Sequence, residues 1–417
     1  MKRKEIFLVI VLVAFGLLYH AVEKGRVRFS RDFSFYANDR QPKGDRFSEF
    51  PVQDMQFSEV SRVRVENPAG EVTIDSSSDG LVHLAAKMRV FHSGGKDLDA
   101  AAKDAEVRTD LNEGTLKVSV RAPSPFPYHR LRVLLQLRVP ADIPLSVYNR
   151  EGNVTVRDTG GDLRVDQENG DLVLENIPSR SRLLLKNGSA KMRGLPEGME
   201  IRAAHARVDI EDAASLNLDG RHGEFSVRNL SGDAVVDMAY GKLIVDGAAR
   251  LEITARHGDI TARNIRNGAV VTNQYEATLM EDVNGDIRVS SRSGRIELRR
   301  AAGNVAIENS YADIAIAGFT GARLDVLLKN GNLNLSAAAV SDRVNIKARF
   351  AELDLSFAAS SDPTFSINAS HGRISAAPRL GLEIFQEKEE TYANRAGRKP
   401  EILIHNTYGN VRVDVAE

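Results

Sequence analysis

The amino-acid sequence predicts an all-β fold, a parallel β-solenoid whose short strands wind repeatedly around one continuous core. Three observations predict it: a repeat of about 18 residues, two apolar pairs in each repeat, and a glycine turn between the pairs. One position per repeat, which we call the anchor, makes the period visible. Between residues 151 and 311 the anchors are 17 or 18 residues apart. The anchors are Glu151, Asn169, Asn187, His205, His222, Tyr240, His257, Tyr275, Ser293, Tyr311, Asn330, Phe350, His371 and Tyr408.

Each repeat contains two strands. The third and fifth residues after every anchor are apolar except for Thr278, and the residue between them is mixed in character. A second apolar pair lies six and four residues before the anchor, as in Leu216 and Leu218. Alternation with a period of two is the pattern of a β-strand. The links between strands are too short for helices, so each repeat is one rung of a coil that must stack on its neighbours to bury its apolar side.

The corners of each rung have their own residues. Glycine commonly follows the anchor, as in Gly170-Asp171, and supplies the backbone freedom that a sharp bend needs. Eight residues after the anchor a single apolar residue recurs, for example Leu195 and Phe319, and is expected to point inward. Charges largely alternate in sign two positions after the anchor, which predicts a ladder of opposite charges on adjacent rungs. Members of this ladder are Arg207, Glu224, Lys242 and Asp259.

Composition excludes several classes of protein. The chain has 417 residues, of which 42% are hydrophobic and 27% charged, as expected of a globular protein with a large core. The net charge of -1 leaves no overall basic field, so we expect no nucleic-acid partner. The chain has no cysteine, which removes disulfides, thiolate zinc sites and cysteine nucleophiles.

The N-terminus predicts membrane attachment. Residues 6–22 form an apolar run that would be about 26 Å long as a helix, close to the short limit for a bilayer crossing. Because no clear small-residue cleavage site follows, we interpret this run as an uncleaved transmembrane signal anchor. A cleaved secretory signal is the alternative, and both interpretations export the rest of the chain. The predicted location is the cell membrane, with a single pass and the solenoid on the extracytoplasmic side.

The predicted domain organisation follows from these patterns. Within the N-terminal capping module, an α+β excursion from the repeat, we expect strands at 81–91, 115–121 and 130–139 and a helix at 96–109. The insertion is expected to be a loop or hairpin. The predicted parts are a cytoplasmic tail (1–5), the membrane span (6–22), a tether (23–58), a first rung with the capping module (59–148), and the solenoid repeats (149–417) with an insertion at 381–400.

One candidate binding ridge emerges from the anchors. If the rungs stack in register, five anchor rings form a row on one corner. We interpret this row either as a surface that stacks against sugar faces and donates hydrogen bonds from its ring edges, or as rings that only stabilise one another. No carboxylate stands in this column among or next to the five rings, so we expect neither a metal nor a cofactor. The ridge consists of His205, His222, Tyr240, His257 and Tyr275.

No motif in the sequence assigns a catalytic residue. Polysaccharide lyases and hydrolases on β-helices need carboxylates that converge on one groove, and here the outward carboxylates are scattered singly. Nucleophile elbows, zinc-protease motifs, phosphate-binding loops and dinucleotide fingerprints are also absent from the sequence. The sequence therefore favours a protein that is not an enzyme.

The repeat motifs resemble a known family. The run GNVTVRDTGGDLRVDQENGDLVLENI, the later HGDITARNI and NGDIRV, and the opening VRVENPAGEVTID are similar to the putative-adhesin family of bacterial β-strand-repeat domains, over roughly residues 60–415. The resemblance implies an envelope-associated solenoid and carries no catalytic residues with it.

Together these patterns predict a membrane-anchored, adhesin-like binding or scaffold protein of the cell envelope, without catalysis. Its expected partners are the membrane, through residues 6–22, and an envelope glycan or protein. Two alternatives remain open: a β-helix polysaccharide lyase or hydrolase of the envelope, and an envelope-sensing signalling or assembly subunit.

Overall fold

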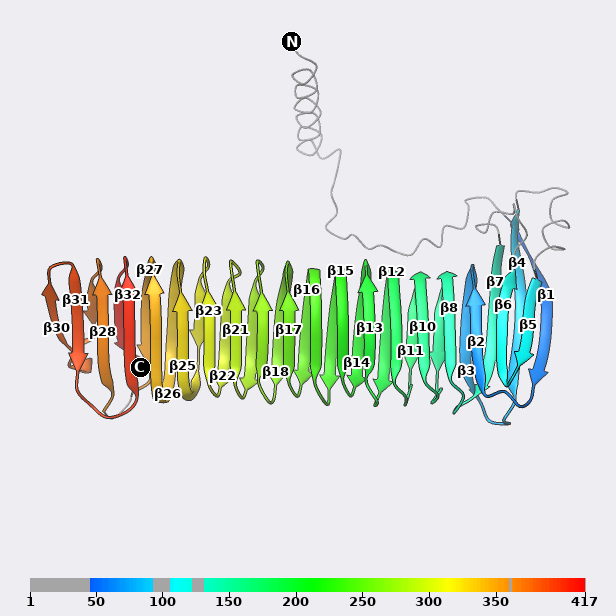
Figure 1. Cartoon of the computed structure of the whole chain (residues 1–417), viewed down its shortest axis with the longest axis horizontal. Helices are drawn as coiled ribbons and strands as arrows, with labels where there is room; N and C mark the ends of the chain where they lie inside the picture. The colour runs from blue at the N-terminus through cyan, green and yellow to red at the C-terminus, as the bar shows by residue number, and fades with distance from the viewer. Residues whose placement is uncertain (1–45, 93–105, 122–130, 360–361, 417) are drawn as a thin grey trace, which may run out of the picture. The chain divides into compact units, whose positions relative to one another are not determined.

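A computed structural model describes residues 46–92, 106–121, 131–359 and 362–416, and this part of the chain is a parallel β-solenoid (Figure 1). Each rung has a strand that ends at the anchor, which we assign to the first face, and a strand that begins after it, on the second face. Neighbouring rungs pair in parallel and in the predicted register. Val147 lies opposite Val165 on the first face, and Val154 opposite Leu172 on the second.

Most strands belong to one face. Three strands run through the anchor corner and one, β26 (Gly331–Arg349), runs through the opposite corner, so that each of these four serves both faces. First-face strands are β2 (Arg62–Asn67), β8 (Leu145–Glu151), β10 (Leu163–Asn169), β13 (Met199–Ala204), β17 (Leu251–Ala255), β19 (Ala269–Asn273), β21 (Ile287–Ser291), β23 (Val305–Asn309), β25 (Thr320–Leu328), β28 (Thr364–Ser370) and β32 (Glu401–Thr407). Second-face strands are β3 (Gly70–Ser77), β9 (Val154–Arg157), β11 (Leu172–Glu175), β14 (Ala206–Ala213), β18 (Gly258–Ile265), β20 (Thr278–Asn284), β22 (Ile296–Ala302), β24 (Ile314–Ala317), β27 (Ala351–Phe357), β29 (Ile374–Ala376) and β33 (Val411–Val415). The continuous strands are β12 (Ser181–Leu195), β15 (Leu216–Leu230), β16 (Ala234–Ala248) and β26 (Gly331–Arg349).

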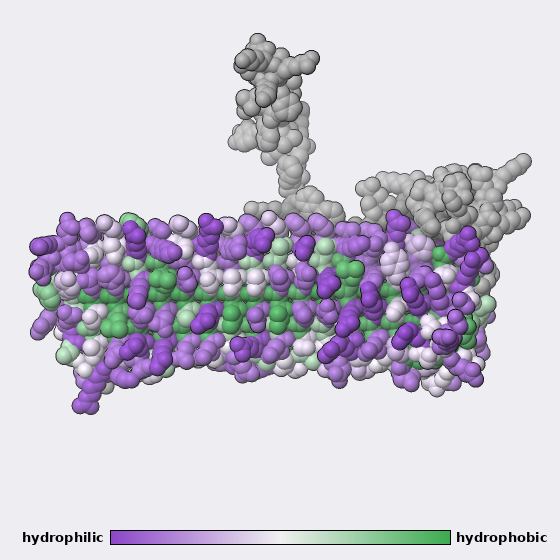
Figure 2. Space-filling model, in the orientation of Figure 1, coloured by the Kyte–Doolittle hydropathy of each residue, from purple (hydrophilic) through white to green (hydrophobic). Residues whose placement is uncertain are grey.

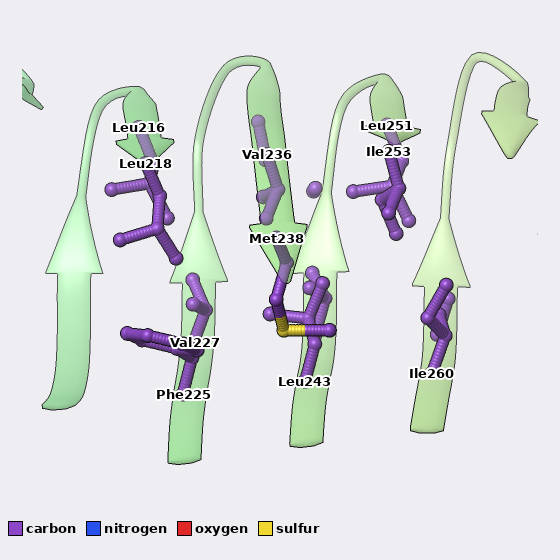
Figure 3. Close-up of a cluster of buried hydrophobic side chains, with 14 of the residues drawn as sticks. Leu216, Leu218, Phe225, Val227, Val236, Met238, Leu243, Leu251, Ile253 and Ile260 are labelled. Carbon is purple, nitrogen blue, oxygen red and sulfur yellow. The ribbon is translucent and has the colours of Figure 1, made fainter. Parts of the chain in front are cut away.

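The core fills the space between the two faces. Figure 3 shows the inward side chains of both faces meeting, among them Leu218 and Phe225, which are 1% and 2% exposed. Leu195 and Phe319, the predicted inward corners, are fully buried. Figure 2 shows a hydrophobic band along the solenoid between hydrophilic margins, as expected when inward and outward residues alternate.

Thr278, the one exception to the apolar pattern, is also buried. Its hydroxyl oxygen accepts a hydrogen bond from Asn273 Nδ2 at 3.2 Å. A buried hydroxyl is tolerated when it has a partner, so this position keeps the register without an apolar side chain.

The predicted ladder of opposite charges is present at one step as an ion pair. Arg207 Nη2 lies 3.6 Å from Glu224 Oε2, and Lys242 and Asp259 follow as direct partners of the next rungs. These side chains are exposed, so the pair contributes about 0 to 1 kcal/mol.

Two strands at the N-terminal end differ from the prediction. The prediction of a tether was wrong for Arg46–Phe57. These residues form β1, which pairs antiparallel with β4 (Val82–His92). The prediction of a helix was wrong for residues 106–109, which are the start of β5 (Glu106–Asn112). β1 contains Pro51 and a register shift between Pro51 and Gln53, so it lacks the sustained period of two that predicts a strand. In β5 the buried Val107 contacts the core although its neighbours are polar.

The rest of the N-terminal cap agrees with the prediction. β6 (Thr115–Arg121) and β7 (Leu131–Pro140) were expected, as was the first rung, β2 and β3. That rung lies between β6 and β8 on one face and between β7 and β9 on the other. Antiparallel strands β4 and β5 then follow outside it.

The C-terminal rungs do not stack in chain order. β32 lies between β26 and β28, and β33 lies between β27 and β29, so the last rung of the sequence is the penultimate rung of the stack. The insertion makes this return possible. It forms the antiparallel hairpin β30 (Glu383–Glu387) and β31 (Glu390–Arg395), and β31 pairs antiparallel with β28. A short 3-10 helix, η2 (Pro378–Leu380), precedes the hairpin.

Antiparallel strands therefore cover both faces at the N-terminal end of the parallel stack and the first face at the C-terminal end, which protects these strand edges from pairing with another chain. Among the residues that the structure describes, no helix has the length and apolar character needed to cross a membrane. The predicted cytoplasmic tail, the membrane span at 6–22 and the tether residues 23–45 lie outside the described residues.

Candidate functional site

The five rings of the ridge form one continuous stack along the anchor corner. Successive ring centroids are 4.9, 4.8, 4.7 and 4.5 Å apart from His205 to Tyr275, and the planes of neighbouring rings differ by 3°, 2°, 8° and 10°. The spacing is that of adjacent strands, so the backbone itself sets the stack. The prediction that these five rings form a row on successive rungs is therefore confirmed.

The stack changes what the ridge can offer to a ligand. Each of the three inner rings has another ring against both faces, so little face area is left for stacking on a sugar. The ring edges remain outward: Tyr240 is 46% exposed and Tyr275 37%. Imidazole nitrogens and phenol hydroxyls at these edges donate and accept hydrogen bonds. The ridge is therefore suited to polar groups such as hydroxyls and carboxylates.

Three ridge residues have a costly backbone conformation. His205, His222 and Tyr240 have φ values of 54°, 52° and 62°, in the left-handed region. A bulky residue is uncommon there and costs of order 1 kcal/mol or more, whereas glycine would fit without strain. Left-handed residues of this kind cluster at functional sites, which supports a role for these rings beyond forming the turn.

Glycine is required directly beside the ridge. A Cβ atom on Gly241 would lie 2.0 Å from the Gly223 carbonyl oxygen of the preceding rung. The preceding rung therefore approaches too closely at Gly241 for a side chain there, whereas Ala206 and Glu276 occupy the same position at the two ends of the ridge.

Buried amides support the anchor corner from below. Asn273 Nδ2 donates to the carbonyl oxygens of Gly258 and Glu276, both at 2.9 Å. Asn309 makes the same pair of bonds to Gly294, at 3.0 Å, and Ala312, at 2.9 Å. Sequence reasoning missed this inner column. Its signal was a polar residue at an inward position two residues before the anchor.

A second ring stack lies nearer the C-terminal end of the same corner. Phe350 stacks on Tyr408 at 5.0 Å, and Tyr408 stacks on His371 at 4.6 Å. Arg349 lies over the outer side of this group, 4.8 Å from the centre of the Phe350 ring. Sequence reasoning named these anchors but assumed that the rungs follow chain order, so it did not bring Tyr408 between the other two.

The most concentrated polar group outside the ridge is on the C-terminal hairpin. The carboxylate of Glu390 accepts hydrogen bonds from the Ser370 hydroxyl and, at 2.9 Å, from Asn368 Nδ2. The Ser370 hydroxyl is the main reason that the pKa of Glu390 lies below its usual value, with Asn368 second. Both bonds hold β31 on β28. The arrangement lowers the basicity of Glu390, so it is a structural clasp rather than a general base.

Two hollows carry no converging catalytic groups. The first, about 580 Å³, is an open groove at the corner opposite the anchors, lined by residues such as Asn176 and Pro178. The second, about 460 Å³, lies at the C-terminal end beside Phe357 and Phe365. Its Arg379 is bonded to Asp414 at 3.1 Å. Within the described part of the chain, no three metal-binding side chains come together.

The fold and corner geometry define a parallel β-solenoid that displays a stacked row of rings along one corner. The particular family is shown by a family model, Toastrack DUF4097, that matches residues 60–414. The chain belongs to this family, which confirms the resemblance to the adhesin-like β-repeat domains. A comparison with curated proteins gave no match.

Solved structures that match this chain include three bacterial proteins. A "putative cell adhesion protein" from Clostridium sporogenes is 9% identical with a TM-score of 0.16, over 89% of this chain and 99% of that one. A "putative adhesin" from Parabacteroides merdae is 11% identical with a TM-score of 0.24, over 66% and 95%. A "putative lipid binding protein" from Parabacteroides distasonis is 8% identical with a TM-score of 0.24, over 69% and 97%. Matches with TM-scores this low do not support any conclusion about function.

Proposed function

We propose that this protein is a membrane-anchored binding and scaffold protein of the cell envelope, without catalytic activity, and that the ridge is its contact surface. In this proposal residues 6–22 hold the chain in the membrane and the solenoid lies on the extracytoplasmic side. The apolar run at the N-terminus supports the anchoring.

The observation that carries the binding role is the row of rings in a strained backbone. Stacking on neighbours recovers part of the cost of the left-handed conformation at His222 and Tyr240, but a glycine would avoid that cost altogether. The same column uses Asn169 and Asn187 elsewhere, whose amides bond at 3.0 Å, so rings are not needed to build the corner. A ligand that uses the ring edges explains why they are present.

The absence of converging acid and base groups among the described residues favours binding over catalysis. A glycosidase requires two carboxyl groups about 5 to 9.5 Å apart across a groove. Carboxylates such as Glu175 and Glu281 instead pair with arginines of adjacent rungs, Arg157 at 2.8 Å and Arg263 at 3.2 Å. Their charge is therefore already balanced within the solenoid.

The test replaces ridge rings by asparagine, which tolerates the left-handed region and already occupies this column. The full chain in mild detergent would carry His222→Asn, Tyr240→Asn and His257→Asn, and its retention on cell-envelope material freed of membrane lipid would be measured. We expect retention to fall about tenfold or more while the thermal midpoint changes by only a few degrees.

A matched control removes three exposed hydrophobic side chains of the first face that lie away from the ridge. These are Tyr148, Leu184 and Leu327, each about 40% exposed and each changed to asparagine. The control should be retained like the unchanged protein. Equal retention of the ridge variant and the unchanged protein would overturn the proposal and leave the ridge as a structural stack.

A further inference from the structure

Beside the ridge runs a single-signed row of charges that the ridge alone does not explain. The residue directly before the anchor points outward on the first face, and on alternate rungs it is basic. Between Lys186 and Lys329 no acidic residue occupies this column. We call these residues the basic row: Lys186, Arg221, Arg256, Arg292 and Lys329.

The spacing of the basic row is regular. The rungs between its members carry Ala204, Ala239, Gln274 and Ser310, which are uncharged. Two strand spacings separate successive charges, about 9.6 Å. All five basic residues are exposed.

Much of the basic row lacks an internal counter-charge. Arg256, Arg292 and Lys329 form no ion pair with any residue in the described ranges. Arg221 lies 4.0 Å from Asp219, at the limit of an ion pair, and Lys186 is bound to Glu168 at 2.8 Å. On the second face, by comparison, Arg193 and Arg263 each pair with a carboxylate of the next rung. Unpaired like charges add nothing to folding, so a counter-charge from outside is the simplest reason for the row.

We propose that the ridge and the basic row together form a track for a linear acidic polysaccharide that lies along the solenoid axis. This inference rests on the proposed function and specifies its ligand. Hydroxyls of the sugar rings would bond to the outward edges of His222, Tyr240 and His257. Carboxylates spaced about two strand widths apart, close to the length of a disaccharide unit, would meet the guanidinium groups.

A nucleic acid fits this surface less well. Sequence-independent binding of a single strand uses aromatic faces on which bases stack, and here the ring faces already cover one another. Phosphates are also denser than the row, since each strand of B-DNA carries one charge per about 3.4 Å. The net charge of the chain is -1, so no general basic field adds to the attraction.

The experiment separates the row from the ridge. The full chain in mild detergent would be passed over immobilised hyaluronate, an acidic polysaccharide with one carboxylate per disaccharide, and over the same polymer with its carboxyl groups methyl-esterified. The row variant carries Arg221→Gln, Arg256→Gln and Arg292→Gln. We expect it to lose about tenfold of its retention on the acidic polymer, because exposed ion pairs contribute modestly and add over three positions.

A control variant has the same charge change at the same spacing on the second face. It carries Arg193→Gln, Arg228→Gln and Arg263→Gln, which also lie on alternate rungs. It should be retained like the unchanged protein on the acidic polymer. Retention of the unchanged protein should also fall when salt is raised, since the contacts are exposed.

Several outcomes would overturn the inference. They are equal retention on the acidic and esterified polymers, equal losses in the row and control variants, and stronger competition by a single-stranded oligonucleotide than by soluble hyaluronate. Under any of these, loss of envelope retention in the ridge variant would still support the proposed function. If the unchanged protein is not retained on envelope material at all, the proposed function fails with the inference.

Discussion

Tyr408 stacks directly on Phe350, with ring centroids 5.0 Å apart and ring planes 9° apart, although an entire rung and a hairpin separate the two in the sequence. The contact follows from the position of β32 between β26 and β28. His371, which precedes Tyr408 in the chain, is one rung farther along the stack. The final rung of the sequence has therefore entered the stack instead of ending it.

Paired cysteines test this order, and the chain contains no cysteine of its own. Phe350→Cys with Tyr408→Cys should oxidise readily, because residues on adjacent rungs are about 4.8 Å apart and a disulfide joins Cα atoms 4.4 to 6.8 Å apart. Phe350→Cys with His371→Cys should not, since two rungs separate them. Gel mobility after mild oxidation distinguishes the pairs, and the reverse result would restore the chain order that the sequence predicted.

The central rungs could be predicted from sequence because their period is local. Whether a side chain such as that of Ile260 points into the core can be predicted from the residues on either side of it, and the same alternation repeats in every rung. Rung order at the ends could not be predicted in this way, since β32 fits the apolar pattern equally well before or after β28. The choice depends on long-range pairing and on the hairpin β30/β31, which have no periodic signature.

The candidate site was predictable to a similar extent. The column of rings follows from the period, but the orientation of the rings does not. Whether Tyr240 presents a face or an edge depends on the backbone at the anchor and on the rings above and below it. Buried amides such as Asn309 were missed because the sequence analysis considered the apolar pairs of each repeat and not the inward position two residues before the anchor.

Two neighbouring substitutions test which side chains of the central rungs point into the core and which point to solvent. Ile260 is 1% exposed, and Ile260→Asp would bury a carboxylate without a partner, which costs several kcal/mol. Thr261 points outward, so Thr261→Asp should change the free energy of unfolding by about 0.5 kcal/mol or less. Chemical denaturation of both variants measures the difference. A similar loss in the free energy of unfolding for both variants would contradict the assignment of Ile260 to the core and Thr261 to the surface.

Membrane attachment is tested by topology. If residues 6–22 anchor an exported solenoid, protease should digest the solenoid in cells whose outer barrier has been opened, and leave it intact in sealed inside-out vesicles. The chain should also stay with the membrane after washing with carbonate. Recovery of a mature chain that starts near Val22 would contradict the anchor and favour a cleaved signal.

The C-terminal clasp predicts a specific dependence on pH. The pKa of Glu390 lies below its ordinary value of 4.5, chiefly because the Ser370 hydroxyl and then Asn368 donate to the ionised form. A carboxyl with a lowered folded pKa stabilises the fold above its ordinary pKa and loses that contribution as the pH falls through the lowered value. The nearby charged groups are His371, His405 and, opposite on β30, Glu387.

Glu390→Gln should therefore lower the stability of the hairpin at pH 7, and the difference from the unchanged protein should close as the pH falls below about 4. Hydrogen exchange of the β28 and β31 amides, compared between the two proteins at each pH, measures it. Glu383→Gln is a suitable control, because Glu383 is exposed on β30 and makes no ion pair with a described residue. It should have the same small effect at every pH. A difference at Glu390 that persists unchanged at pH 3 would mean that the shape of the side chain, rather than its charge, holds β31 on β28.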